Sequence, residues 1–277
     1  MAAQKPIITL SKLLATTSPI DAQLKAPASS SEGPEENSAA SRFSVDQVIL
    51  KPDSRIVMVT DPRSPGADRL RYLRLRLQEL RGLSKLKTLS ITSALPKDGK
   101  STVALNLAVA LSEGGKRRVL IIEGDLHQPA LSMILDVPRR EGLAECLEEN
   151  SDPLSCISFL DPLGIHLLQA GKAHANPTEL LQSSALSVVL EKLSSSFEWI
   201  LIDTPPVVPL TDAITLSRLS DGTLFVVRAD QTPRQAVDEA ISQVGQRNIV
   251  GIVVNGVQEL NDNYYKYAKY YGKGPQS

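Results

Sequence analysis

The sequence is poor in cysteine, in long apolar runs and in net charge. Its two cysteines, Cys146 and Cys156, lie ten residues apart without a histidine partner at metal-ligand spacing, so neither a zinc site nor a disulfide framework is indicated. No apolar run approaches the roughly 18 residues of a membrane span. The net charge of -1 provides no overall basic field, and we therefore expect no nucleic-acid partner.

The amino-terminal region lacks the features of a targeting or folded segment. Its start, MAAQKPIITLSKLLATT, lacks the charged beginning, the long apolar core and the cleavage site that define a signal peptide. Residues 26–42 contain no aromatic residue and no Val, Ile or Leu, so burial cannot offset their ordering entropy. We predict a disordered leader over residues 1–50, a domain over 51–258 and a flexible tail over 259–277. We expect a cytoplasmic protein that reaches a membrane only through a partner.

Aromatic residues are scarce except at the carboxyl end. Five of the six tyrosines lie in the last fourteen residues: Tyr264, Tyr265, Tyr267, Tyr270 and Tyr271. Nothing in this tail can bury five rings, and termini are poorly ordered unless something ties them down. We therefore expect the rings to be exposed. From the residues alone they could stack on nucleic acid, form a binding site for a partner, or accept phosphate.

Short apolar runs alternate with helical segments from residue 87 onward. The predicted strands are residues 87–92, 118–124, 165–169, 199–203, 222–228 and 249–254. The clearest predicted helices are residues 101–113, 178–194 and 233–246. The strands are nearly continuous apolar runs, which is typical of a sheet covered on both faces. The alternation predicts an α/β fold with a doubly wound, mostly parallel sheet.

A candidate phosphate-binding loop follows the first of these strands. The segment ALPKDGKST matches the pattern G-x-x-x-x-G-K-[ST], except that Ala94 occupies the first glycine position. Backbone N–H groups would face a phosphate, Lys100 would supply positive charge, and the Ser101 hydroxyl would bind Mg²⁺. The predicted nucleotide-binding residues of this P-loop NTPase are Ala94, Leu95, Pro96, Lys97, Asp98, Gly99, Lys100, Ser101 and Thr102.

Three carboxylates follow other predicted strands. Glu123 and Asp125 come at the end of the second strand, and Asp203 ends the run WILID. Ligands of open α/β sheets bind at the carboxyl edge of the strands, so these side chains should meet the phosphate loop. Each one alone could be a turn residue or a helix cap. Together they predict a site for ATP and Mg²⁺, with Ser101, Asp125 and Asp203 as the metal ligands.

The segments ALPKDGKST, VLIIEGDLHQP and ILIDTPPV occur in the order and spacing of the Walker A, A′ and B motifs of the bacterial tyrosine kinases. From about residue 55 to its end the sequence resembles that family, whose fold is similar to the MinD/ParA ATPases. The resemblance implies a tyrosine autokinase of capsule or exopolysaccharide synthesis. It implies that Lys100, Glu123, Asp125 and Asp203 are catalytic, with Glu123 as the base for the phenol, and that the five tail tyrosines accept phosphate.

A helix predicted over residues 66–81 completes the resemblance. One face carries leucines that should pack inward: Leu70, Leu73, Leu77 and Leu80. Another face carries Asp68, Arg71 and Arg74, which alone would be compatible with an ordinary solvated surface. The family has E-x-x-R-x-x-R here, which implies a ring-forming contact that passes one subunit's tail into its neighbour's active site. The resemblance also implies a membrane-anchored activator, or polysaccharide co-polymerase, that recruits the protein to the inner face of the plasma membrane.

The sequence departs from the family pattern at two positions of the Walker A′ motif. Glu123 replaces an aspartate, and His127 replaces an arginine. These departures favour one alternative, a degenerate nucleotide-binding regulator of the same machinery. A MinD/ParA-type ATPase is a second alternative, but Leu95 occupies the position of the signature lysine of that class and argues against it.

Overall fold

The computed structural model describes residues 43–51, 54–149, 151–172 and 175–257. An eight-stranded sheet in the order β1-β4-β5-β3-β6-β2-β7-β8 forms its centre. The strands are β1 (Ser44–Gln47), β2 (Thr88–Ser93), β3 (Val119–Glu123), β4 (Ile157–Asp161), β5 (Ile165–Leu168), β6 (Trp199–Asp203), β7 (Gly222–Arg228) and β8 (Ile249–Asn255). Among these strands only β4 and β5 pair antiparallel, so the predicted mostly parallel sheet is confirmed.

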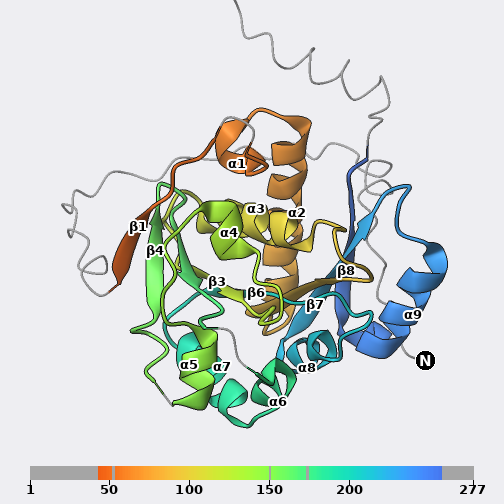
Figure 1. The fold of residues 1–277 in the computed structure, drawn as a ribbon. Helices are drawn as coiled ribbons and strands as arrows, with labels where there is room; N and C mark the ends of the chain where they lie inside the picture. Colours follow the sequence, from red (N-terminus) through yellow and green to blue (C-terminus); the bar gives the residue numbers. More distant parts are fainter. Residues whose placement is uncertain (1–42, 52–53, 150, 173–174, 258–277) are drawn as a thin grey trace, which may run out of the picture.

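Helices cover both faces of the sheet, with α1 to α4 on one side and α5 to α9 on the other (Figure 1). The helices are α1 (Val57–Thr60), α2 (Pro65–Leu83), α3 (Lys100–Ser112), α4 (Leu131–Leu135), α5 (Leu143–Glu148), α6 (Pro177–Leu181), α7 (Ala185–Ser194), α8 (Asp212–Leu219) and α9 (Arg234–Val244). This arrangement is the doubly wound P-loop NTPase fold that the sequence predicts. No helix of the described residues is long and apolar enough to cross a membrane.

The central strands divide their side chains between two hydrophobic cores. Every residue of β2, β3 and β6 is buried. Ile121 and Leu201 join the core that includes residues of α2 and α3, whereas Ile122 and Ile202 join the core beneath α5 to α7. Successive residues of a strand point to opposite faces, so an all-apolar strand supplies both cores at once. This explains why the predicted strands are continuous apolar runs.

The first strand lies in a segment that was predicted to be a leader. Residues Ser44–Gln47 form β1, which pairs with β4 at the sheet edge, so the prediction of disorder is wrong for these residues. Asp46 is bound by the guanidinium of Arg140, at 2.6 and 3.2 Å, and Phe43 packs edge-on against His166. These partners lie far away in the sequence, so local composition does not reveal the strand. Residues 1–42 lie outside the described residues.

Two other elements differ from the predictions. Strand β4 was not predicted, although the sequence DPLG after it is a turn signal that could have indicated a hairpin with β5. The single helix predicted over residues 178–194 is two helices, α6 and α7. The backbone N–H of Ser183 donates to the carbonyl of Leu180, and serine competes with helical hydrogen bonding, which accounts for the interruption.

Helix α2 confirms the helix predicted over residues 66–81. Its N-cap is Ser64, whose hydroxyl accepts a hydrogen bond from the Ala67 backbone at 3.2 Å, and Pro65 follows at the first helical position. Leu77 is buried, and Leu73 and Leu80 pack against the same core. The leucine face therefore points inward as the spacing predicts.

Candidate active site

The phosphate loop connects the end of β2 to the start of α3. The chain leaves the sheet at Ser93 and enters α3 at Lys100, as the strand-loop-helix pattern predicts. Gly99 has φ +94°, and a Cβ at this position would collide with the side-chain amide of Asn255. Glycine is therefore required both by its backbone conformation and by the close approach of β8. Because the loop opens a helix of thirteen residues, backbone N–H groups and the helix dipole favour an anion here.

Lys100 brings several predicted site residues together. Its Nζ atom lies 3.5 Å from Oδ2 of Asp125 and 3.9 Å from Oδ1 of Asp203. The same atom lies 3.4 Å from the hydroxyl oxygen of Ser101. The three side chains come from the ends of β3 and β6 and from the first turn of α3, so the carboxyl edge of the sheet assembles them. Asp125 also accepts a hydrogen bond from the Gln128 backbone at 3.0 Å, which holds the turn after β3.

Asp203 is a buried carboxylate without a hydrogen-bond partner. Its side chain has no exposed surface, and neither carboxylate oxygen accepts a hydrogen bond from any described residue. Burial raises its pKa from 3.8 to about 6, although the Lys100 ammonium opposes this change. An orphaned anionic group of this kind is costly unless a cation compensates it. The observation fits a role for Asp203 in holding a metal ion.

The donor set fits Mg²⁺ bound together with a nucleotide. Within the described parts of the chain, no group of three or more His, Cys, Asp or Glu side chains could hold a metal ion by itself. Magnesium in phosphate-transfer sites usually takes only one or two carboxylates and completes its shell with hydroxyl, phosphate and water oxygens. Ser101, Asp125 and Asp203 supply a hydroxyl and two carboxylates around Lys100.

Glu123 occupies the Walker A′ position, but its carboxylate is already fully hydrogen-bonded. Oε1 accepts from the backbone N–H groups of Leu131, at 2.6 Å, and Ser132, at 3.2 Å. Oε2 accepts from the Ala170 backbone and the Ser132 hydroxyl, both at 3.1 Å. The side chain therefore caps the start of α4 and joins it to the segment after β5. This geometry gives Glu123 a structural task and does not support its predicted role as base for the phenol.

His127, at the position of the family's arginine, contacts an acid that the sequence analysis missed. Its Nε2 atom lies 2.8 Å from Oδ2 of Asp212, which is buried at the start of α8. The Thr178 hydroxyl lies 3.5 Å from the same nitrogen. An acid at the first position of a helix is a common signal for a helix start, so the sequence could have indicated Asp212. It could not have indicated that His127 is its partner.

The predicted oligomerisation residues make contacts within their own chain. Arg71 pairs with Asp68 at 2.8 Å and donates to the carbonyl of Pro62 at 2.6 Å. Arg74 instead faces α3, where it donates to the carbonyl of Ala110 at 3.3 Å. The two arginines thus do not present one equivalent exposed surface. The five predicted phosphate-acceptor tyrosines lie outside the described residues.

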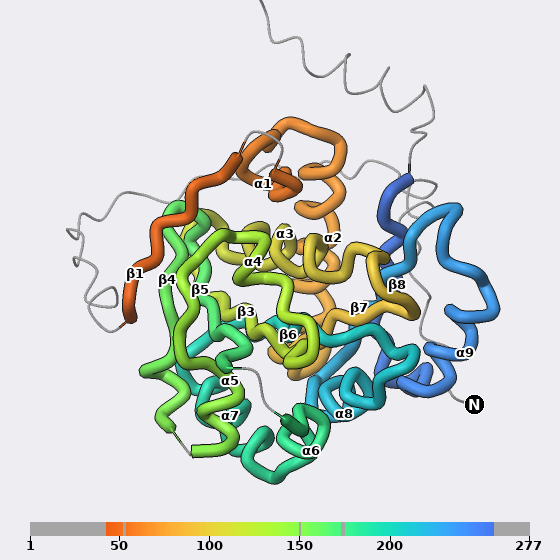
Figure 2. Tube along the Cα trace, viewed as in Figure 1, coloured from red at the N-terminus to blue at the C-terminus, as the bar shows by residue number. Residues whose placement is uncertain are grey.

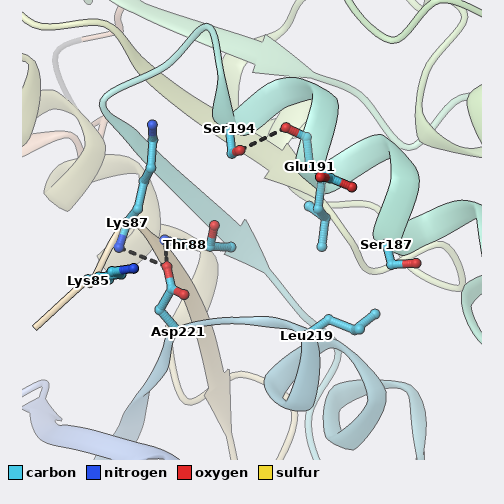
Figure 3. Close-up of a pocket in the computed structure, with 9 residues that line it drawn as sticks. Lys85, Lys87, Thr88, Ser187, Glu191, Ser194, Leu219 and Asp221 are labelled. Carbon is cyan, nitrogen blue, oxygen red and sulfur yellow. Dashed lines mark hydrogen bonds between the residues drawn. The ribbon is translucent and has the colours of Figure 1, made fainter.

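A separate hollow of about 300 Å³ lies at the opposite edge of the sheet (Figure 3). It adjoins Thr88, the first residue of β2, whereas the phosphate loop follows the last residue of that strand. Two lysines, Lys85 and Lys87, and two acids, Glu191 and Asp221, line it. Asp221 binds the backbone N–H groups of residues 87 and 88 at 2.9 and 2.7 Å. The hollow carries balanced charge and has no connection with the predicted site.

Comparison with known families agrees with this geometry. Residues 87–276, more than half of the chain, match the ParA family model, which is described as the NUBPL iron-transfer P-loop NTPase. The tyrosine-protein kinase CpsD of Streptococcus agalactiae is 31% identical over 187 residues, which cover 66% of this chain and 81% of CpsD. The chain belongs to the bacterial tyrosine-kinase family of ParA-type P-loop NTPases. This bacterial tyrosine kinase therefore has a nucleotide-binding fold, and the predicted family is confirmed.

Other relatives show how much of the chain the likeness covers. Tyrosine-protein kinase YwqD of Bacillus subtilis is 27% identical over 76% of this kinase and 90% of YwqD. Succinoglycan biosynthesis transport protein ExoP of Rhizobium meliloti is 32% identical over 79% of this chain, but the match spans 29% of ExoP. Among solved structures, the chimerical protein CapA2B2 superposes with a TM-score of 0.69 at 27% identity, over 80% of this chain and 97% of CapA2B2.

Proposed function

We propose that this protein is an ATP-dependent protein tyrosine kinase. The observation that carries the proposal is the unpartnered Asp203 carboxylate beside Lys100 at the phosphate loop. Lys100 and the loop backbone would bind the nucleotide phosphates, and Ser101, Asp125 and Asp203 would hold Mg²⁺. The metal ion would neutralise charge on the transferred phosphoryl group. The γ-phosphoryl group would move from ATP to a phenol oxygen, ADP would be the leaving group, and the phenol proton would be released.

We infer that the phosphate acceptors are Tyr264, Tyr265, Tyr267, Tyr270 and Tyr271. Support comes from the position of β8, which ends at the same sheet edge as the phosphate loop. The end of β8, which precedes the tail in the sequence, therefore lies on the side of the molecule where the nucleotide would bind (Figure 2). From the last described residue, 257, a chain of seven residues reaches at most about 25 Å. The tail is long enough to enter a site on its own or a neighbouring subunit, and we propose the neighbour.

Assembly through α2 is a further part of the proposal. Asp68 and Arg71 lie on its outer side, and Tyr72 and Leu75 leave 38% and 49% of their surface exposed. An exposed mixture of charge with apolar surface suits a contact between subunits. We propose that this surface forms a ring-like homo-oligomer, and that Arg74 takes part only if its side chain leaves the carbonyl of Ala110.

We propose a role in capsule or exopolysaccharide synthesis or export, with a membrane-anchored activator, or polysaccharide co-polymerase, as partner. The support is similarity to CpsD and ExoP, whose names are those of a tyrosine kinase and a succinoglycan transport protein. In this proposal the partner recruits the protein from the cytoplasm to the inner face of the plasma membrane.

The state of Glu123 favours a second candidate, a nucleotide-binding regulator without kinase activity. Its carboxylate oxygens accept hydrogen bonds from the start of α4 and from residue 170, so the residue expected to act as base is engaged elsewhere. A MinD/ParA-type ATPase would instead hydrolyse ATP without modifying tyrosine. The three possibilities differ in their products.

One incubation separates these functions. The full chain is incubated with radiolabelled ATP and Mg²⁺, with and without an activator peptide, and phosphotyrosine and ADP are measured. A kinase forms both, an ATPase forms ADP alone, and a regulator binds nucleotide but forms neither. Lys100→Met should abolish phosphotyrosine, whereas Lys116→Met, an exposed lysine beyond the far end of α3, should not. Phosphotyrosine formation by Lys100→Met at the wild-type rate contradicts the proposal.

A further inference from the structure

The side chain of Asp98 joins the phosphate loop to the segment between β7 and α9. Asp98 is 4% exposed. Its Oδ2 atom accepts a hydrogen bond from the Leu95 backbone at 3.2 Å, inside the loop. Its Oδ1 atom accepts a hydrogen bond from the Thr232 hydroxyl at 2.7 Å, and this bond connects the loop to a residue outside it. Thr232 follows β7 in the chain and precedes α9, so the contact crosses 134 residues of sequence.

Two more contacts support the same part of the loop. The side-chain amide of Asn255, at the end of β8, donates to the carbonyl of Asp98 at 3.0 Å. The Arg228 guanidinium donates to the carbonyl of Lys97 at 3.5 Å. The Thr232 oxygen in turn accepts from the Arg228 backbone at 3.0 Å. The ends of β7 and β8 therefore hold the loop from the outside of the nucleotide site.

The loop needs external support because of its backbone. Lys97 has φ +69° and Gly99 has φ +94°, so the residue before Asp98 and the residue after it are both in the left-handed region. Lysine is disfavoured in that conformation, and such residues persist only where their surroundings impose it. A hydrogen bond to a buried carboxylate is among the stronger interactions available for this purpose.

We propose that Asp98, Thr232 and Asn255 form a clamp that holds the phosphate loop in its nucleotide-binding conformation. These are positioning residues, because they act on the backbone that would contact phosphate and are not themselves required to touch it. A loop that is already ordered does not lose conformational entropy when the ligand binds, so the clamp raises nucleotide affinity. The clamp rests on the nucleotide-binding part of the proposed function and not on transfer to tyrosine.

Affinity for ADP tests the clamp without any assay of tyrosine transfer. Thr232→Val keeps the shape of the side chain but removes the hydroxyl, and it should weaken binding of a fluorescent ADP analogue with Mg²⁺ about tenfold. Thr232→Ser restores the hydroxyl and should bring the dissociation constant back to within about threefold of the wild type. The control is Asn248→Ala, which removes an amide that caps the carbonyl of Val244 away from the loop. It should bind ADP like the wild type.

A second variant covers the case in which Thr232→Val does not fold. Asp98→Ala removes the other partner and by itself should weaken ADP binding at least about tenfold. Where both single variants fold, the double variant should bind ADP no more weakly than the weaker single variant, because the two residues share one interaction. Wild-type affinity in Thr232→Val, or fully additive losses in the double variant, overturns the clamp. Failure of the wild-type chain to bind ADP contradicts the proposed function instead. Normal ADP binding without phosphotyrosine formation refutes only the proposed kinase activity. The ADP affinities of the variants then still decide whether the clamp exists.

Discussion

Glu123 and Asp203 are two buried acids at neighbouring positions of the sheet, and they have opposite surroundings. They are paired residues of β3 and β6, and their side chains are 1% and 0% exposed. Glu123 accepts hydrogen bonds from α4 and from the segment after β5, whereas Asp203 accepts none from the described residues. The two acids are therefore equally buried but differ in their hydrogen bonding. An acid with all its hydrogen bonds made stabilises the fold, and one without them suits the binding of a ligand.

The burial of Asp203 is energetically unfavourable, whereas the burial of Glu123 is compensated. The hydrogen bonds of Glu123 compensate for its removal from water. The Lys100 ammonium, 3.9 Å away, and the Ser101 side chain offset the burial of Asp203 only in part, because its pKa is still raised. Proteins retain such unfavourable groups at functional sites, where a bound ligand completes the missing contacts. Substitutions at the two acids should therefore affect stability in opposite directions.

The largest expected effect is that of Asp203→Asn on phosphoryl transfer. Removing a charge that is needed to hold Mg²⁺ should lower the rate of phosphotyrosine formation at least about a hundredfold. The same change removes a buried charge whose burial outweighs its attraction to Lys100, so the ligand-free variant should melt at a higher temperature than the wild type at pH 7. Kinase assays and thermal melts check the two effects. A variant with wild-type activity would mean that Asp203 does not hold the metal ion.

The pH dependence of stability should differ between wild type and Asp203→Asn. The folded-state pKa of Asp203, about 6, exceeds its usual value of 3.8, so the folded state binds the proton more tightly. Protonated Asp203 contributes about 3 kcal/mol to the free energy of unfolding. This contribution is fully present below pH 3.8 and is lost as the pH rises through 6. Urea unfolding of the ligand-free protein between pH 4 and pH 7 measures this loss. The loss should be missing in Asp203→Asn, and identical profiles would refute the perturbed pKa.

Glu123→Gln should have the opposite character to Asp203→Asn. Its amide group would face backbone donors of α4, so we expect a loss of about 2 kcal/mol in the free energy of unfolding. Phosphotyrosine formation below the melting temperature should stay within about threefold of the wild type. Denaturant unfolding and kinase assays on the same sample test both statements. A hundredfold slower reaction with unchanged stability would restore Glu123 as the base.

The smallest effect is expected at Ser132, which donates its hydroxyl to the Glu123 carboxylate at 3.1 Å. Ser132→Ala leaves the backbone donors in place, so the unfolding free energy should fall by about 1 kcal/mol. Ser187→Ala is a matched control, because that hydroxyl donates to the carbonyl of Ser184 on an exposed turn and its loss should cost less than about 0.5 kcal/mol. Equal losses in the two variants would show that the network around Glu123 has no special strength.

Local patterns in the sequence determined most of the fold and the position of the site. Mostly apolar runs of five to seven residues define β3, β6 and β7, and the segment ALPKDGKST between strand and helix places Lys100 and Ser101 at the start of α3. Because parallel strands end at one edge, Asp125 and Asp203 could be expected beside them. Each of these inferences uses residues that are close in sequence or a rule about strand ends. Strand β1 and the interruption between α6 and α7 lacked such a signal.

Only the tertiary structure decided what the individual side chains do. The sequence determined that Glu123 and Asp203 end buried strands, but it gave them equal standing as site carboxylates. The structure separates them, because the donors that satisfy Glu123 come from residues 131, 132 and 170, and no described residue supplies donors to Asp203. The contact of Asp98 with Thr232 across 134 residues is of the same kind. Hydrogen bonds depend on distance and direction in space, and a linear pattern carries neither across a fold.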